Sequence, residues 1–166
     1  YEVKELQEQI ANFASTMAEK LRKQHSVTSE IVVFAYTNRF KDDAPQTYAN
    51  ALVSFVTPTA DQRTIITEAV HAMQKSFKSG YGYKKAGVIA TKIIDEKNIM
   101  HSLFEDTEAI EREHKITSAL DAINSTFGKG TIKLAVQGSG KIKTSSESQS
   151  PHYTTLWSDI PNVTVK

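Results

Sequence analysis

The side chains that most often bind metals or carry acid–base chemistry are scattered along this sequence. Asp42 and Asp43 form a carboxylate pair, but adjacent residues of an extended loop point apart and share a metal poorly. No two of the five histidines lie four positions apart, the spacing that would bring them together on a helix: His25, His71, His101, His114 and His152. His71 lies beside apolar positions of a predicted helix, which favours a core-edge role. The sequence therefore predicts no metal centre and no catalytic site.

Two glycine-containing stretches invite a nucleotide-binding interpretation, and both fail on spacing. Residues 138–141 read Gly-Ser-Gly-Lys, but a phosphate-binding loop needs a glycine where Ala135 stands and a serine or threonine where Ile142 stands. Gly80 and Gly82 lack the third glycine of a dinucleotide-binding turn. We expect no nucleotide cofactor.

Charge is sorted along the chain although the net charge is only +1. Residues 69–94 and 122–146 contain lysines and no acid, and five acids gather between 105 and 113. Such blocks are compatible with a phosphate-binding face, and equally with an ordinary solvated surface.

The elements that would position these residues follow from hydrophobic spacing. Residues 3–21 carry an apolar stripe at steps of three and four, which predicts a helix. Residues 30–40 are β-branched and aromatic, and residues 50–56 alternate, so both are predicted strands. Thr59 and Gln62 have the spacing of a capping box before a second helix, and residues 83–94 form a further strand. Residues 1–95 thus indicate an α+β unit with two helices on one face of a sheet.

The remainder divides into a linker, residues 96–107, and a C-terminal region, residues 108–166. The linker carries an exposed Leu103-Phe104 pair. The C-terminal region is predicted to begin with a helix that Gly128 and Gly130 end, followed by a short strand over 131–137 and a polar segment around Tyr153 and Trp157. This part of the fold is expected to be a small helix–strand tail.

Composition bounds the cellular setting. The chain has 166 residues, 39% of them hydrophobic, and no cysteine, so disulfides and thiolate zinc sites are excluded. No apolar run reaches the roughly 18 residues of a membrane span. The first residues open directly into a helical pattern, from which we expect a piece of a longer, cytoplasmic protein.

Three stretches resemble the C-terminal half of UmuC-like proteins, which are translesion DNA polymerases of the Y family. They are residues 83–88 following 57–61, residues 127–131 leading into 135–138, and residues 150–161, which are close to the terminal signature of that family. The resemblance implies that residues 1–95 form a little-finger domain with a four-stranded sheet backed by two helices. The fourth strand has no clear signal of its own and is expected near residues 26–40. The metal-binding catalytic carboxylates, and their Mg²⁺, would lie in a palm domain absent from this sequence.

The resemblance implies that the sheet grips primer–template DNA through its phosphates, without reading sequence, during SOS-type damage bypass near the nucleoid. Alternation places Ala86, Val88 and Ala90 toward the helices and leaves the other face open. The predicted DNA-binding residues are Lys84, Lys85, Gly87, Ser54, Asn50, Tyr36, Arg39 and Lys41. Gly87 would let the backbone approach a phosphate. The alternative for Lys84 and Lys85 is a solvated pair.

Two protein partners are also implied by the resemblance. Leu103 and Phe104 lie where UmuC-like proteins carry a sliding-clamp peptide, with Met100 in place of the expected glutamine. The alternative is that Phe104 only packs the linker onto the domain. The extreme C-terminus is expected to meet a UmuD′-like protein, so the alternative function is a protein-interaction module with little DNA affinity of its own.

Overall fold

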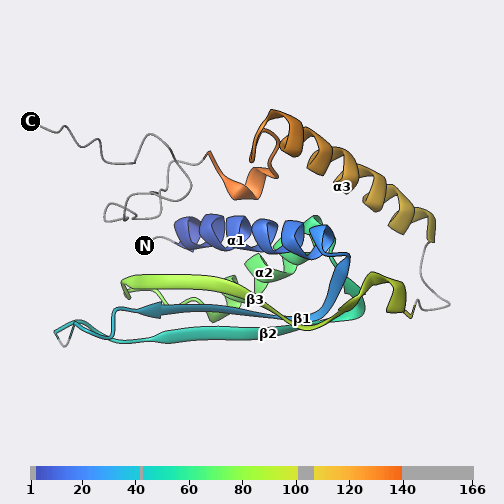
Figure 1. Ribbon diagram of the computed structural model, residues 1–166. Helices are drawn as coiled ribbons and strands as arrows, with labels where there is room; N and C mark the ends of the chain where they lie inside the picture. The colour runs from blue at the N-terminus through green and yellow to red at the C-terminus, as the bar shows by residue number, and fades with distance from the viewer. Residues whose placement is uncertain (1–2, 42, 101–106, 140–166) are drawn as a thin grey trace, which may run out of the picture.

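The computed structural model describes residues 3–41, 43–100 and 107–139. The elements run α1 (Val3–Lys23), β1 (Ser26–Thr37), β2 (Tyr48–Thr59), α2 (Gln62–Ser76), β3 (Tyr83–Asp95), η1 (Glu96–Asn98), α3 (Thr107–Phe127) and η2 (Ala135–Gln137). Figure 1 shows α1 and α2 side by side over one face of the sheet, with α3 on the helix side. The predicted α+β unit with both helices on one face is confirmed.

The sheet contains three antiparallel strands among the described residues, in the order β2-β1-β3. The expected fourth strand is wrong for this part of the chain. Ser26–Thr37 is one continuous strand of 12 residues, because buried and half-buried side chains alternate from Glu30 to Thr37 and only a register shift, without a turn, separates them from Thr28. The central strand pairs with β2 on one side and with β3 on the other.

The core lies between the sheet and the two helices. Alternate residues of the strands face the helices, with Ile31 and Val33 from β1 fully buried against Ile65, Ile66 and Met73. Three alanines on one face of α1, Ala11, Ala14 and Ala18, are also fully buried and allow close packing. Burying each larger aliphatic side chain contributes roughly 1.5–3 kcal/mol, so this layer dominates the stability of the fold.

The start of α2 differs from the expected capping box. Asp61 is the N-cap, and its side chain accepts a hydrogen bond from the Thr64 backbone N–H at 2.7 Å. Thr59 does not cap the helix itself: its hydroxyl oxygen accepts a hydrogen bond from the backbone N–H of the cap residue, Asp61, at 3.0 Å. Aspartate is as good a cap as serine or threonine, and its negative charge also suits the helix N-terminus.

The predicted C-terminal strand over 131–137 is wrong. A turn at residues 129–130 and a bend at 131–132 lead into an irregular connection, and Ala135–Gln137 is a single turn of 3-10 helix. Gly128, Gly130 and Gly138 have positive φ values of 106°, 83° and 66°. These turn-forming glycines leave no extended segment between them that is long enough to pair with another strand. The helix before it is confirmed, since α3 ends at Phe127, directly before Gly128.

Candidate nucleic-acid interface

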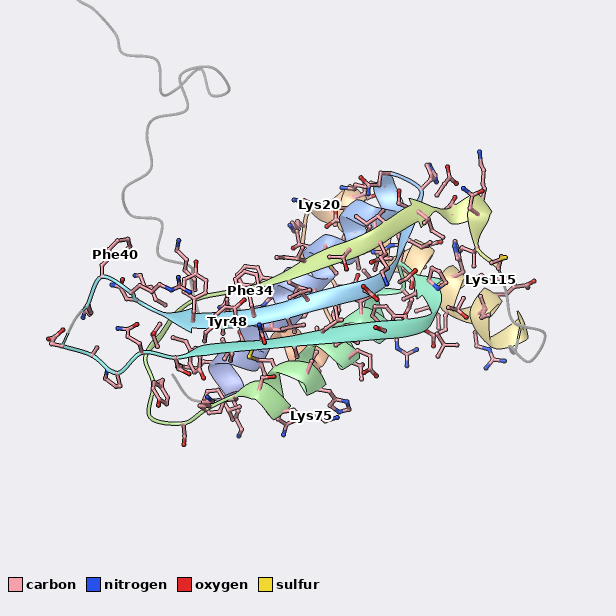
Figure 2. All side chains as sticks on the ribbon, turned by 90° about the horizontal axis from the view of Figure 1, so that it is seen from below. Lys20, Phe34, Phe40, Tyr48, Lys75 and Lys115 are labelled. Atoms are coloured by element: carbon pink, nitrogen blue, oxygen red, sulfur yellow. The ribbon has the colours of Figure 1, made fainter. Side chains whose placement is uncertain are left out.

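The face of the sheet that the helices leave open carries three aromatic rings at one end, beside the β1–β2 loop. Phe34 and Tyr36 are two residues apart on β1 and therefore lie on the same face. Tyr48 of β2 pairs with Tyr36 across the strands. The ring centroids of Phe34 and Tyr36 are 6.0 Å apart, and those of Tyr36 and Tyr48 are 6.2 Å apart. These separations fall in the range of attractive aromatic pairs. Figure 2 looks onto this face, with Phe34 and Tyr48 at the same end of the sheet.

Two cationic side chains flank the central ring. Lys85 on β3 pairs with Tyr36 on β1, and its Nζ lies 6.0 Å from the Tyr36 ring centroid. The Arg39 guanidinium, from the loop, lies 5.8 Å from the same centroid. Both distances are at the outer range of a cation–π contact, so each cation is held near the ring and still faces solvent.

Lys84 and Gly87 have distinct local settings on β3. The register of β3 against β1 shifts between Tyr36 and Thr37, which makes Lys84 an extra residue at the sheet edge with an exposed side chain. Gly87 lies on the open face, opposite Phe34. A Cβ there would meet the Phe34 Cζ at 2.7 Å, so the absent side chain makes room for the aromatic ring.

The remaining predicted contacts spread along the same surface. Asn50 and Ser54 are exposed on the open face of β2, and Lys41 is exposed in the loop. Farther from the loop, the positive charge on this face is neutralised, because Lys92 pairs with Glu30 at 2.5 Å. Of the remaining lysines of the acid-free window, Lys75 lies on α2, in the helix layer (Figure 2), and Lys78 follows that helix. Positive charge therefore concentrates at the loop end, on Arg39, Lys41, Lys84 and Lys85.

Three aromatic residues of this surface were not among the predicted contacts: Phe34, Tyr48 and Phe40. Phe34 shares the strand parity of Tyr36, so the alternation already assigned it to the open face. Tyr48 was missed because β2 begins at Tyr48, two residues before the predicted start of that strand. Phe40 was missed because β1 ends at Thr37, so Phe40 lies in a loop and not at the end of a strand as predicted. The predicted clamp residues, Leu103 and Phe104, lie outside the described residues.

The C-terminal region is attached on the helix side of the molecule. Arg22 of α1 forms a two-point ion pair with Asp121 of α3, at 2.6 and 2.7 Å. Thr117 donates to the N-cap Asp61 at 3.1 Å. Farther along, the buried Gln137 of η2 exchanges hydrogen bonds with Asn12 of α1, at 3.1 and 3.3 Å. These contacts leave the open sheet face uncovered by any described element (Figure 1).

A cavity of about 450 Å³ lies at the other end of the fold, lined by α3, by the β2–α2 connection and by Ile99. Two of its charged lining residues already have structural partners: Arg22 binds Asp121, and Asp61 caps α2. Among the described residues there is no group of three histidine or acidic side chains placed to hold a metal ion. The described residues that line the cavity form no recognisable metal-binding or catalytic arrangement. The open sheet face is therefore the stronger candidate for the functional site.

Comparison with known proteins agrees with the sequence resemblance. A family model described as the impB/mucB/samB family C-terminal domain matches residues 1–103, more than half of the chain. The chain belongs to the impB/mucB/samB family. A second model, described as a domain of unknown function (DUF4113), matches residues 114–163 of this family member.

Relatives of this impB/mucB/samB chain align over nearly all of it. Protein UmuC of Salmonella typhimurium is 34% identical over 160 residues, which are 96% of this chain and 38% of that protein. Protein MucB of Escherichia coli is 32% identical over 164 residues, 98% of this chain and 38% of its own. DNA polymerase IV of Desulfatibacillum aliphaticivorans is 32% identical over 84 residues, 50% of this chain and 21% of that enzyme. The chain thus spans about two-fifths of the length of UmuC and MucB. The resemblance to UmuC-like polymerases is confirmed.

Proposed function

We propose that this chain supplies the DNA-gripping sheet of an error-prone translesion polymerase, and that it holds primer–template DNA without reading its sequence. The observation that carries the proposal is the open sheet face, where Lys85 and Arg39 flank Tyr36 and no described element covers the surface. Family membership supports the same activity, since one aligned relative is named a DNA polymerase.

The chemistry of the surface suits a phosphate backbone better than base edges. Arg39, Lys41, Lys84 and Lys85 are exposed at the loop end, and lysine and arginine neutralise phosphates while releasing condensed counterions. Farther from the loop on the same face, the exposed apolar side chains of Leu52 and Ile89 offer no hydrogen bonds for reading base edges. A grip of this kind tolerates damaged bases, because it positions the duplex without inspecting it.

Polymerisation itself is assigned, in this proposal, to a palm domain that this chain does not include. Mg²⁺ bound there by catalytic carboxylates would supply the chemistry of nucleotide addition. The described residues include no group of three histidine or acidic side chains placed to hold such an ion. The part of this chain is to hold and orient the DNA.

The test is the salt dependence of primer–template binding, measured by fluorescence anisotropy at several salt concentrations. The double variant Lys84→Ala/Lys85→Ala should bind more weakly on all sequences. Its slope of log K against log salt should fall by about 0.9 for each phosphate that the lysines neutralise in the wild-type chain. The matched control is Lys20→Ala/Lys75→Ala, which removes the same charge from exposed positions on α1 and α2. Equal slopes and affinities for both doubles would refute the proposed face.

A second candidate function is a protein-interaction module, and α3 favours it. Two large apolar residues of α3 stay exposed, Ile116 at 47% and Phe127 at 74%. The face that meets the body of the protein instead carries Thr117 and Asp121. A UmuD′-like protein is the partner that we propose for the C-terminal region to which α3 belongs, with the contact expected at its extreme C-terminus, and the sliding clamp is the partner that we propose for Leu103 and Phe104. Pull-down of each purified partner by the chain, with and without DNA, separates this function from the first.

A further inference from the structure

The loop between β1 and β2 presents an aromatic ring between two cations. Phe40 is 95% exposed, and its neighbours Arg39 and Lys41 are exposed as well. Phenylalanine is a costly residue to leave in water, since its burial would contribute roughly 1.5–3 kcal/mol. An almost completely exposed ring at a loop tip is therefore available to bury its surface against a ligand.

The exposed ring does not result from a loose loop. The side-chain nitrogen of Gln46 lies 3.1, 2.9 and 3.0 Å from the carbonyl oxygens of Asn38, Lys41 and Ala44. The Gln46 side-chain oxygen accepts from the buried Thr37 hydroxyl at 2.6 Å. The Phe40 N–H itself donates to the Asn38 side chain at 3.2 Å. The loop is held in the shape that displays Phe40, which lowers the entropy cost of binding through it.

The ring stands at the same end of the sheet as the aromatic surface. Figure 2 shows Phe40 on the loop beyond the end that carries Phe34 and Tyr48, and Tyr48 is 49% exposed on the open face. Four cations lie at this end, Arg39, Lys41, Lys84 and Lys85, against the two acids in the sequence of the loop, Asp42 and Asp43. The fitting ligand has a flat apolar face and a negative charge close together.

An unpaired nucleotide has both features. Its base stacks on an exposed aromatic ring, and its phosphate meets the flanking arginine or lysine. A paired base inside a duplex offers no free face, so the ring has no stacking partner along intact double-stranded DNA. We propose that Phe40, with Arg39, Lys41 and Tyr48, binds unpaired nucleotides of the single-stranded template beside the duplex. This rests on the proposed DNA binding of the open sheet face and names the part of the DNA that the loop contacts.

The experiment compares labelled DNA probes against the 166-residue chain and its variants. The probes are a blunt duplex, the same duplex with a single-stranded overhang, the same overhang without bases, and the single strand alone. The wild-type chain should bind the overhang probe at least about fivefold more tightly than the blunt duplex, the affinity equivalent of the weakest base–aromatic stack. Phe40→Ala should lose that preference, and Phe40→Trp should retain it. Phe127→Ala is the control, since it removes another exposed ring from α3.

The probe without bases separates stacking from charge. If stacking operates, the wild-type preference disappears on it, whereas a preference that survives on bare phosphates would overturn the inference. Equal binding of overhang and blunt duplex would also overturn it while the proposed function stands. Phe40-dependent binding of the single strand, with no affinity for duplex, would refute the duplex grip and support the loop site. If Phe40→Ala changes no DNA affinity, the inference is wrong.

Discussion

Arg22 and Asp121 join the first helix to the third across 99 residues of chain. The guanidinium of Arg22 meets both carboxylate oxygens of Asp121, at 2.6 and 2.7 Å, and its third nitrogen donates to the Ala60 carbonyl at 2.9 Å. A planar guanidinium suits this geometry, which lysine would not reproduce. The pair ties the C-terminal region to the two-helix layer at the point where β2 passes into α2.

Asp121→Ala should release α3 from the body of the protein. The pair is partly buried, with 16% of the Arg22 side chain and 34% of the Asp121 side chain exposed, so we expect a loss of about 1–2 kcal/mol. Hydrogen exchange should rise in α3 and stay unchanged in β1. The control is Arg63→Ala, which breaks the more exposed pair with Glu113 and should cost less than about 1 kcal/mol. Equal exchange in both variants would show that Arg22 does not hold the helix.

Gly138→Ala should detach η2 from α1. Gly138 has φ +66° and ψ −173°, a conformation accessible essentially only to glycine, and an added Cβ would also overlap the Glu8 carboxylate. We expect a local cost of about 1–3 kcal/mol, read as faster hydrogen exchange at Gln137. Gly82→Ala is the matched control, because nothing lies within 4 Å of its Cβ position and its φ is ordinary. A Gly138→Ala chain with unchanged protection would contradict this account.

Gly87→Ala tests whether the glycine serves packing or DNA approach. The new methyl would meet the far end of the Phe34 ring at 2.7 and 2.9 Å, and turning this half-buried ring away from its preferred rotamer should cost about 0.5–1.5 kcal/mol. Combining it with Phe34→Ala should remove most of that cost, since the ring that clashes is gone. Denaturant unfolding of the two single variants and the double variant measures the coupling. Strict additivity would mean that Phe34 does not occupy this space. DNA affinity of the double variant then reports whether Gly87 also admits a phosphate.

Phe104→Ala should weaken binding to the bacterial sliding clamp and leave the fold unchanged. A leucine–phenylalanine pair on a linker is a suitable anchor for a hydrophobic pocket. Calorimetric titration against the clamp measures the change in affinity, and circular dichroism checks the fold. Met100→Gln, at an 89% exposed position, should strengthen the same interaction. If both variants bind as the wild-type chain does, Phe104 does not engage the clamp.

Local patterns predicted a large part of this fold correctly. The helical spacing of residues 3–21, the end of α3 before Gly128 and the alternation of β3 all depend on residues close in sequence. Alternation also placed Lys85 on the open face and Val88 toward the helices, because side chains of a strand alternate whatever the partner strand is. The alternation of residues 131–137 wrongly predicted a strand. An alternating segment forms a strand only where the open edge of a sheet is available to pair with it.

By itself the sequence determined the three long helices, the approximate positions of the three paired strands, the family and the acid-free window that contains Lys84 and Lys85. Only the tertiary structure decided which of those charges gather. Cross-strand register brought Tyr48 and Lys85 to Tyr36, and it set Phe34 over Gly87. The packing of α3 against the rest of the protein placed Thr117 and Asp121, rather than the apolar Ile116, toward the body of the protein. The physical reason is that pairing and packing join residues far apart along the chain, whereas hydrophobic spacing reports only the face that each element turns toward its neighbours.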